Sequence, residues 1–598
     1  MIDLFKKPYL LYLLIIIIIG GFFRFYNLNW DQGHHLHPDE RAIIMFALPL
    51  HFPQNLSDFF SKESTLNPHF FAYGNFPLYL LKGTATVLSN FDMSLDSYDK
   101  INLVGRAIST IADLGTIILI YFIGKKIFGK RVGIIGAFFY AISVFPIQAA
   151  HFYAVDSLLT FFILLTLYQL IRFYEKPTLK KSILVGIFFG LSLATKTSAV
   201  VLIVAIGMAI AVDFLLIFLK SPHRPHIWFP HIPKFLKRLS IDGAVITTTT
   251  VLTFLILEPY ALIDFKEFWR QTIEQSQMTR DAFTFPYTLQ YVGKIPYFYE
   301  LKNIFLWGQG PILATISFAG IIYTLFHIIK KQKYKKWAQE LILLIFLLSY
   351  FAVVGKFAVG WMRYMLPLYP LLALFAAVFL HRLLSFRASS ASRGISHNSL
   401  SGMRSLHALR LVGMTVTIIL IFVWPLSFIH IYTKPNTRVL ASQWIYENIP
   451  PDKKIALEHW DDGLPIGGNI SYKTLELPIY EMQNPIREAE IYQTIQEADY
   501  IIITSNRLYA PLQRISKNCQ KWNLPSERCS HNANRYYKRL FGAKLGYQKV
   551  AEFSVYPTLE IGNWKLEIDD SSADESFTVY DHPKVIIFKK ISFYNILF

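Results

Sequence analysis

Four charged residues lie close to the ends of separate apolar segments of this chain: the acids Asp39 and Asp156 and the cations Lys196 and Arg363. Residues of these types could together transfer a sugar from a phosphate ester. A carboxylate can take the proton from an attacking hydroxyl, and cations can hold the phosphate while negative charge grows on it. The transition state would resemble an oxocarbenium ion, as in glycoside hydrolysis. This chemistry requires a fold that brings residues far apart in the sequence into one chamber.

The composition predicts a fold of membrane-spanning helices. Of the 598 residues, 53% are hydrophobic and 16% are aromatic, and the apolar residues are concentrated in runs. These runs have about the length of a helix that crosses a bilayer core, and inside lipid the backbone must bond within its own segment. About eleven transmembrane helices are therefore predicted. They lie at Pro8–Phe25, Ile101–Ile123, Val132–Ala150, Ala154–Ile171, Ile183–Ala194, Ser198–Leu219, Ala244–Leu262, Ile304–Ile329, Leu341–Val354, Tyr364–Leu380 and Leu411–Val423.

The basic residues predict the orientation of these helices. The formal net charge is +18, and much of the excess lies in alternate loops, at 125–131, 172–181, 220–238, 330–336 and 382–410. Lys and Arg concentrate in the cytoplasmic loops of membrane proteins, so the N-terminus is predicted to be cytoplasmic and the C-terminal domain extracytoplasmic. This placement argues against a nucleic-acid partner and favours a multi-pass protein in contact with membrane lipids. No retrieval signal is seen at Asn595-Ile596-Leu597-Phe598, so the expected location is the plasma membrane.

In this orientation the four charged residues all lie at the outer face. Charged groups near membrane depth usually face a cavity or a partner, so we expect one polar cavity there. The first outer loop, 27–100, contains the apolar segment Phe76–Leu88, which is short and includes Lys82. Counting it as a span would place basic loops on both sides of the membrane. It is predicted to lie at the outer interface as a helix, or to dip in and out.

The C-terminal region, 432–598, forms a domain separate from the membrane domain, 1–431. It is less hydrophobic and has no run long enough to span a bilayer. Its predicted helices and strands alternate, which is typical of an α/β domain. The helices are predicted at Asn436–Glu447 and Glu488–Gln496, and the strands at Lys454–Leu457, Tyr500–Thr504, Gln548–Tyr556 and Lys584–Lys590.

Two local features of this domain have more than one explanation. Cys519 and Cys529 are the only cysteines, and they could form a disulfide on an oxidising side of the membrane or remain free thiols. The cluster His459-Trp460-Asp461-Asp462 could be a carbohydrate or acceptor surface. The Gly463 and Pro465 that follow it favour a structural turn.

The most specific motif lies in the first outer loop. His37-Pro38-Asp39-Glu40 follows the first span by a short distance and opens the apolar segment Ala42–Leu50. It resembles the first-loop acidic motif of the GT-C glycosyltransferase superfamily. Within that superfamily it is most similar to the branch of dolichyl-phosphate-mannose protein mannosyltransferases and lipid A aminoarabinose transferases. Further segments resemble this branch in the same order along the chain: Tyr73–Tyr79, Gly105–Arg106, His151–Asp156, Ala194–Lys196 and Arg363–Pro370.

The resemblance covers the membrane domain and implies a polyprenyl-phosphate sugar donor, inversion at the sugar carbon and Asp39 as the catalytic base. It implies that Asp156 supports the acceptor or the geometry of the site. Lys196 and Arg363, together with the outer-loop cation Lys356, are predicted to bind the donor phosphate. The C-terminal domain does not resemble the beta-trefoil of the eukaryotic enzymes, so the acceptor stays open among protein, lipid and wall glycan. The residues predicted to support the site are Glu40, His37, His151, Glu258 and Tyr73.

Simpler interpretations of the same residues remain open. Asp39 and Glu40 could be solvated acids, or acids favoured by the dipole at a helix N-terminus. Lys196 could extend to the membrane surface, and Arg363, which follows Trp361, could lie at the interface without binding a ligand.

No cofactor is required by the predicted chemistry, but a divalent metal is possible. His34, His35 and His37 lie in one loop with Asp39, and imidazole and carboxylate groups are metal ligands. Solvated loop histidines are the alternative.

Two other functions compete with sugar transfer. One is a transporter or flippase of lipid-linked saccharides. Transporters tend to place charges at the bilayer midplane and to have repeated halves, whereas here the charges gather at one face and no repeat is visible. The other is a scaffold that displays its outer domain, which normal glycosylation in an Asp39→Asn variant would favour.

Overall fold

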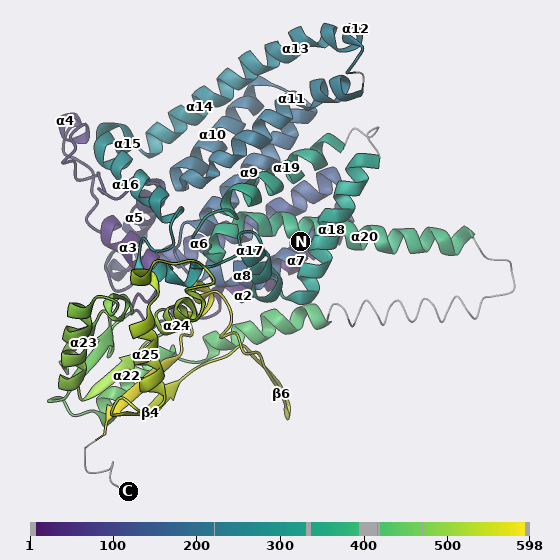
Figure 1. The fold of residues 1–598 in the computed structure, drawn as a ribbon. Coiled ribbons are helices and arrows are strands. Elements are labelled where there is room, and N and C mark those ends of the chain that lie inside the picture. Colours follow the sequence, from purple (N-terminus) through teal and green to yellow (C-terminus); the bar gives the residue numbers. More distant parts are fainter. Residues whose placement is uncertain are drawn as a thin grey trace, which may run out of the picture.

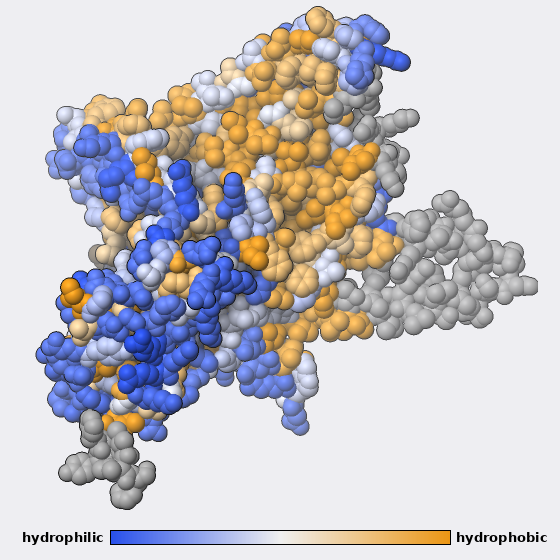
Figure 2. Space-filling model, viewed as in Figure 1, coloured by the Kyte–Doolittle hydropathy of each residue, from blue (hydrophilic) through white to orange (hydrophobic). Residues whose placement is uncertain are grey.

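The computed structural model describes residues 8–220, 222–330, 337–393, 416, 419–468 and 470–591. It consists of a bundle of long helices joined to a C-terminal domain that contains the β-strands (Figure 1). The surface of the bundle is largely hydrophobic, whereas that of the C-terminal domain is largely hydrophilic (Figure 2). The predicted class, a polytopic helical membrane protein with a C-terminal α/β domain, is confirmed.

Eight helices in the described part of the chain are long and apolar enough to cross a membrane, or nine if one bent pair is a single span. The bent pair is α7 (Lys130–Ala141) and α8 (Val144–Ala150), which turn by 61° at the break between them. The eight are Pro8–Phe25 (α2), Ile101–Ile127 (α6), Asp156–Glu175 (α9), Thr197–Phe218 (η2 and α11), Pro225–Leu257 (α12 to α14), Pro311–Ile329 (in α18), Trp337–Val354 (α19) and Met362–Leu383 (η7 and α20).

Two of the predicted spans are not among these eight helices. The segment predicted at Ile183–Ala194 forms α10 (Leu179–Thr195), which is shorter than the other spans at 17 residues and packs against α9 and α14 (Gly243–Leu257). The span predicted at Leu411–Val423 lies largely outside the described residues, which resume as a helix at 419–429. Bounds of the composite spans are η2 (Thr197–Val201), α11 (Leu202–Lys220), α12 (Pro225–Trp228), η3 (Phe229–His231), α13 (Ile232–Lys237), η4 (Arg238–Asp242), α18 (Pro311–Lys330), η7 (Met362–Leu368) and α20 (Tyr369–Arg393).

The long first outer loop folds against the bundle. Its segment Phe76–Leu88 is a helix, α5, with the predicted bounds, and it packs on α6 and on the helix that begins at Pro38. Lys82 lies on another face of α5, where it bonds Asp96 at 2.9 Å. At 13 residues, α5 is shorter than the candidate spans of the described chain. The outer loops contain α3 (Pro38–Ala47), α4 (Leu56–Phe59), η1 (Met93–Asp96), α15 (Tyr260–Ile263), α16 (Phe265–Met278), η5 (Pro286–Tyr291), α17 (Phe298–Asn303) and η6 (Ile304–Gly308).

The C-terminal domain is built on a mixed sheet of five strands in the order β2-β1-β3-β7-β4. β1, β2 and β3 run parallel, whereas β7 pairs antiparallel with both β3 and β4. β5 and β6 form a separate hairpin. The strands are β1 (Lys454–Glu458), β2 (Lys473–Leu477), β3 (Tyr500–Ile503), β4 (Tyr547–Phe553), β5 (Thr558–Ile561), β6 (Trp564–Glu567) and β7 (Val585–Lys590). The helices are η8 (His430–Thr433), α22 (Thr437–Asn448), η9 (Ile479–Glu481), α23 (Pro485–Glu497), α24 (Tyr509–Asn518), η10 (Ser526–Arg528), α25 (His531–Phe541) and α26 (Glu575–Thr578).

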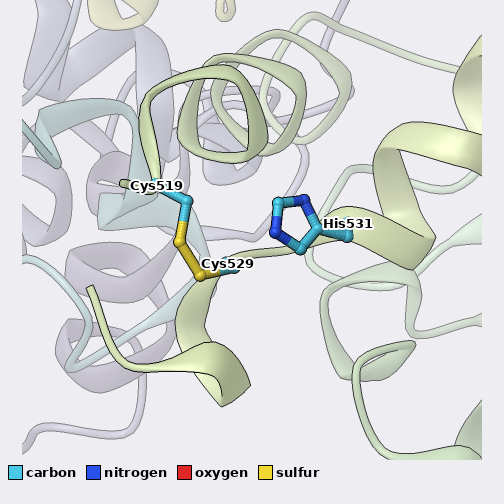
Figure 3. Close-up of side chains that lie close together, drawn as sticks. All are labelled: Cys519, Cys529 and His531. Atoms are coloured by element: carbon cyan, nitrogen blue, oxygen red, sulfur yellow. A yellow bond between two sulfur atoms is a disulfide. The ribbon is translucent and has the colours of Figure 1, made fainter. Parts of the chain in front are cut away.

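The two cysteines form a disulfide. Cys519 directly follows α24 and Cys529 follows η10, and their sulfur atoms are bonded to each other (Figure 3). Of the two possibilities that the sequence allows, the structure has the disulfide.

A buried charged cluster holds the C-terminal domain against the bundle. Asp581 accepts hydrogen bonds from Nε2 of Gln148 at 2.9 Å and from the hydroxyl of Tyr432 at 2.8 Å. The two ring nitrogens of His582 lie 2.5 Å from Asp581 and 2.8 Å from Asp570. Burial alone would lower the pKa of His582, but the two carboxylates raise it to about 10. A charged imidazolium therefore holds the segment before β7 in place.

Candidate active site

Helix α3 presents Asp39 and Glu40 from its first turn. The side chain of His37 caps the helix by accepting a hydrogen bond from the backbone N–H of Glu40 at 3.4 Å. Pro38 occupies the first turn, where its missing N–H is not needed, and acids there are favoured by the helix dipole. Successive side chains of a helix point in different directions, so the two acids reach different surroundings.

Glu40 belongs to a fully buried group of three charges. Arg106 of α6 bonds Glu40 at 2.6 Å and Asp31 at 2.7 Å, and all three side chains are 0% exposed. The backbone N–H of Tyr153 also donates to Glu40, at 2.8 Å. This cluster attaches the first turn of α3 to α6 and to the second outer loop, and it thereby sets the position of Asp39.

Asp39 faces a cavity and is linked there to the other three candidate residues. Its Oδ2 lies 2.9 Å from Nη1 of Arg363, and Nε of Arg363 lies 3.8 Å from Oδ2 of Asp156. Nζ of Lys196 donates to Oδ1 of Asp156 at 2.7 Å. Four residues from α3, η7, α9 and the end of α10 therefore form one alternating series of acids and bases.

Aromatic rings contact both cations of this series. Nζ of Lys196 lies 4.6 Å from the ring centre of Tyr364 and 5.8 Å from that of Tyr73. The guanidinium of Arg363 lies 4.5 Å from the ring centre of Trp361. Cations are attracted to ring faces at such distances, so the rings hold both cations at the cavity wall independently of the carboxylates.

The position of Lys196 depends on a close approach of the first outer loop to the end of α10. The N–H of Gly74 donates to the carbonyl of Thr195 at 3.2 Å. A Cβ at Gly74 would lie 1.8 Å from the carbonyl oxygen of Ala194, so only glycine fits there. This contact places Tyr73 beside Lys196.

Asp39, Lys196 and Arg363 line a cavity of about 1460 Å³, whereas Asp156 is not among the lining residues and is linked to the cavity through its ion pair with Lys196. One side of the cavity is apolar and includes Val200 of η2 and Val353 of α19. Its other side is formed by residues of the C-terminal domain, namely Trp460, Asp461, Asp462, Arg507, Glu575 and Tyr580.

Asp39 is ionised in these surroundings. Burial opposes ionisation, but the positive charge of Arg363 and a hydrogen bond from Tyr73 outweigh it, so the pKa of Asp39 lies below its ordinary value. Burial lowers the pKa of Lys196, and the neighbouring Asp156 only partly offsets this effect. An ionised Asp39 is able to accept a proton.

His37 connects α3 with the C-terminal domain. Its ring contacts those of both Phe152 and Tyr580, with centres 4.5 Å and 4.2 Å away. Burial lowers the pKa of His37 to about 3, so the imidazole is neutral and can accept the capping hydrogen bond. Tyr580 of the C-terminal domain thus touches the residue that caps the helix of Asp39.

Three other residues that were predicted to bind phosphate or to support the site lie at the edge of the cavity or outside it. Lys356 lines the cavity but is exposed. His151 is buried, with its ring nitrogens 2.8 Å and 3.0 Å from the backbone oxygens of Ile147 and Tyr26. Glu258 is also buried, and burial raises its pKa to about 8. Neither His151 nor Glu258 is among the residues that line the cavity.

The cavity wall also contains residues that the sequence did not single out as site residues. Trp361 and Tyr364 flank Arg363, so proximity in the sequence could have suggested them. Tyr287 belongs to η5 of an outer loop, and Arg507 and Tyr580 belong to the C-terminal domain. No local pattern marks these three residues, and only the docking of the domain brings Arg507 and Tyr580 to the cavity.

The described histidines of the first loop do not form a metal-binding group with Asp39. Among described residues, the only set of three or more candidate ligands in mutual reach is Cys519, Cys529 and His531 (Figure 3). The sulfur atoms of that set are joined in the disulfide, and cysteine binds metal as a thiolate. His37 uses a ring nitrogen to cap α3.

Comparison with known proteins identifies the fold. Residues 99–230 match the model of the dolichyl-phosphate-mannose-protein mannosyltransferase family. The chain is similar to the archaeal oligosaccharyltransferase AglB from Archaeoglobus fulgidus, solved with an inhibitory peptide and a dolichol-phosphate. That match has a TM-score of 0.52 and 15% identity, and it covers 98% of this chain and 88% of that chain. The same organism's oligosaccharyltransferase tethered with an acceptor peptide gives a TM-score of 0.51 at 14% identity, over 98% and 89% of the two chains.

A third similar structure is ArnT from Cupriavidus metallidurans bound to undecaprenyl phosphate, with a TM-score of 0.41 and 14% identity over 85% of this chain and 94% of that chain. No curated protein sequence matches the chain. The match to the mannosyltransferase model and the likeness to AglB along nearly the whole chain agree with the motifs of the first outer loop. The chain therefore has the GT-C fold over nearly its whole length, and its residues 99–230 match the dolichyl-phosphate-mannose-protein mannosyltransferase model.

Proposed function

We propose that this chain transfers a glycosyl group from a polyprenyl-phosphate-linked donor to an acceptor hydroxyl, with inversion at the sugar carbon and Asp39 as the base. The observation that carries the proposal is the carboxylate of Asp39, 2.9 Å from Arg363 in a cavity that Lys196, the ion-pair partner of Asp156, also lines. We expect the apolar side of this cavity to open to lipid, and its other side meets the C-terminal domain. A donor with its tail in the bilayer and an acceptor from outside can therefore meet at Asp39.

The reaction uses the acid and the two cations in different roles. The acceptor hydroxyl attacks the sugar carbon, and the new C–O bond forms as the bond from that carbon to the phosphate oxygen breaks. Asp39 takes the hydroxyl proton, and the polyprenyl phosphate leaves with the electron pair of the broken bond. Arg363 and Lys196 stabilise the negative charge that grows on the phosphate. Attack and departure occur on opposite faces of the sugar, so the configuration inverts.

Further positive charge at the cavity supports binding of an anionic donor. The carboxylates of Asp39 and Asp156 neutralise the two central cations in the ligand-free site. Lys356 and Arg280 also line the cavity and are exposed, and neither forms an ion pair with a described acidic residue. Exposed cations at a cavity mouth attract an anionic ligand, and a phosphate can then replace the carboxylates as the partner of Arg363 and Lys196.

The proposed side of the membrane is the outer one. The cavity and the C-terminal domain lie at one end of the bundle, and the basic segment 220–238, which contains α12 and α13, lies at the other (Figure 1). The basic end is expected to be cytoplasmic. This argument supports a cavity that opens outward and a plasma-membrane location.

The test is transfer by the full chain in lipid nanodiscs, supplied with a radiolabelled polyprenyl-phosphate sugar and a cell-envelope extract as acceptor. We expect labelled glycoconjugate from the wild type and a rate roughly 10²–10⁴-fold lower for Asp39→Asn. Asp92→Asn, which changes an exposed carboxylate of the same loop, is the matched control and should retain the wild-type rate. Movement of the donor across the bilayer without a new glycosidic bond would instead favour a flippase.

A further inference from the structure

A row of aromatic rings leads from Asp39 to the C-terminal domain. It begins at Trp361, whose ring supports the guanidinium of Arg363, the partner of Asp39. The ring of Tyr287 lies 6.1 Å from that of Trp361, with an angle of 16° between their planes. The ring of Trp460 lies 5.6 Å from that of Tyr287. All three rings line the cavity, so they form one continuous wall, here called the aromatic wall (Trp361, Tyr287 and Trp460).

Trp460 is held in a backbone conformation that large residues rarely adopt. Its φ is +72°, in the left-handed region, which is costly for bulky residues. Its side chain is nevertheless 41% exposed, so burial of the indole does not account for the strained conformation. Strain of this kind persists where the surroundings fix it, and it is concentrated at functional sites.

Hydrogen bonds fix both the side chain and the backbone of Trp460. Its Nε1 donates to the hydroxyl of Tyr480 at 3.1 Å. Its carbonyl oxygen accepts from Nη1 of Arg507 at 3.1 Å, and Nε of Arg507 is bound to Glu575 at 2.7 Å. The indole is therefore presented to the cavity in one orientation, with little conformational freedom left to lose on binding.

The two acids after Trp460 are paired within the C-terminal domain, and Asp462 also attaches this loop to the membrane domain. Arg438 bonds Asp461 at 3.1 Å and Asp462 at 3.0 Å. Arg41 of α3 bonds Asp462 at 3.1 Å. Trp460 is thus placed relative to the same helix that carries Asp39, and the charges of the loop are neutralised by partners within the protein.

We propose that the aromatic wall is the acceptor site and that the acceptor is a saccharide, with sugar rings packed against Trp460 and Tyr287. This inference rests on the proposed function and names its acceptor class. Sugar rings have apolar C–H faces that pack on aromatic rings, and polar edges. Tyr and Trp offer a large rigid face together with a polar group, and binding sites commonly combine such apolar walls with a few placed polar groups.

The same wall is less suited to a peptide. An extended peptide needs backbone groups to pair with, usually at a free sheet edge. The edge strands of the described five-stranded sheet are β2 and β4, and neither contributes to the lining of the cavity. The acids beside Trp460 are already neutralised, so the wall also lacks a charged pocket for a basic side chain. A row of three rings at similar spacing fits successive sugar units better.

The experiment separates envelope material into polysaccharide, protein and lipid fractions and offers each to the full chain in nanodiscs with the radiolabelled donor. We expect label in the polysaccharide fraction. Trp460→Ala should reduce this transfer roughly tenfold at low acceptor concentration, mainly through a higher KM for the acceptor. Slow hydrolysis of the donor by water, measured without acceptor in the wild type, reports on Asp39, Arg363 and Lys196 separately from the acceptor.

Three variants distinguish the wall from a general loss of structure. Trp460→Phe keeps a ring and should retain most of the transfer. Tyr287→Ala removes the neighbouring ring and should reproduce the higher KM. Trp564→Ala removes an exposed tryptophan from the β5–β6 hairpin, which does not line the cavity, and should behave as the wild type.

The outcomes separate this inference from the proposed function. Label in the protein or lipid fraction would overturn the saccharide class. Label in polysaccharide that Trp460→Ala and Tyr287→Ala leave unchanged would overturn the aromatic wall as its site. Donor that is neither transferred nor hydrolysed by the wild type would overturn the proposed function, and the acceptor inference with it.

Discussion

Asp39 and Glu40 are neighbours in the sequence, yet they belong to two charged clusters of opposite character. The open cluster (Asp39, Arg363, Asp156 and Lys196) contributes three of its members to the cavity lining, and the side chains of Asp39 and Arg363 are 19% and 11% exposed. The closed cluster (Asp31, Glu40 and Arg106) is 0% exposed. Both contain acids and bases brought together from distant segments. Only the open cluster has a side from which a ligand can enter.

This difference in access gives the two clusters different roles. The charges of the closed cluster have no route to water or ligand, so each must keep its partners, and removing one would leave an unpaired buried charge. The cations of the open cluster also rest on aromatic rings, so they can exchange a carboxylate for a phosphate and remain in place. The closed cluster fixes the position of α3, and the open cluster contains Asp39, which α3 presents to the cavity.

Asp39→Asn and Glu40→Gln give the largest expected contrast between the clusters. Asp39→Asn should lower the rate of transfer roughly 10²–10⁴-fold and leave the apparent melting temperature within a few degrees of the wild type. Glu40→Gln should lower stability by about 3–5 kcal/mol, because Arg106 loses a buried charged partner. Activity per folded molecule and thermal unfolding in nanodiscs measure the two effects. A Glu40→Gln variant of normal stability but no activity would reverse the roles assigned here.

Arg363→Gln and Arg106→Gln extend the contrast to the cations. We expect Arg363→Gln to lower the rate roughly 10²–10³-fold with little loss of folded protein, because Asp39 can be solvated through the cavity. Arg106→Gln leaves both Asp31 and Glu40 buried without a cation, so folded protein should be largely lost from detergent extracts. Size-exclusion chromatography together with the transfer assay reports both. Equal losses of folded protein in the two variants would contradict the distinction between open and closed clusters.

The sequence predicts the open cluster better than the aromatic wall for a physical reason. Asp39, Asp156, Lys196 and Arg363 each lie near the end of an apolar segment, and the positive-inside rule places those ends on one side of the membrane. Charges at the ends of packed helices on one side of the membrane have few places to lie other than a shared cavity. Trp460, by contrast, reaches the cavity only because the C-terminal domain docks there, through contacts such as that of Arg41 with Asp462. No periodic pattern in the sequence encodes that contact.

The secondary structure also divides into elements that the sequence predicts and elements that it does not. The buried strand predicted at Tyr500–Thr504 forms β3, which is buried along its whole length. β2 was not predicted, because most of its residues are at least partly exposed and its alternation of apolar and polar residues is short. The bend between α7 and α8 was also missed, although Pro146 lies within the segment predicted as one span. Hydrophobic pattern reports burial in lipid or in a core, and it does not report a bend or an exposed edge.

Gly74→Ala tests whether the open cluster depends on geometry as well as on charge. A Cβ at Gly74 would collide with the carbonyl oxygen of Ala194, so the segments of Tyr73 and Lys196 must move apart. A displacement of about 1 Å at a reacting site can cost roughly 10²-fold in rate, which is the loss expected here. Gly83→Ala is the matched control, because a Cβ at Gly83 of α5 meets no atom within 4 Å. It should keep the full rate and gain slightly in stability.

The smallest expected effect is a pH dependence that separates the site from the domain interface. His582 has a folded-state pKa of about 10, above the ordinary value of 6.5, so it binds more proton in the folded than in the unfolded state. Its contribution to stability is complete below about pH 6.5 and is lost as the pH rises toward 10. The pKa of Asp39 is below its ordinary value of 3.8. The base therefore stays ionised throughout this range, so Asp39 should add no pH dependence to the rate per folded molecule.

Melting temperatures of the wild type, His582→Gln and His531→Gln between pH 6 and pH 10 measure this effect. Glu575 and Glu458, whose pKa values burial raises to about 7 and about 8, also destabilise the folded state as the pH rises. The slope of the wild type alone therefore does not isolate His582. We expect His582→Gln to have a shallower slope than the wild type, and the exposed His531→Gln to match the wild type. Identical slopes for all three proteins would show that the interface contains a neutral His582, and the charged cluster around Asp581 would have to be abandoned.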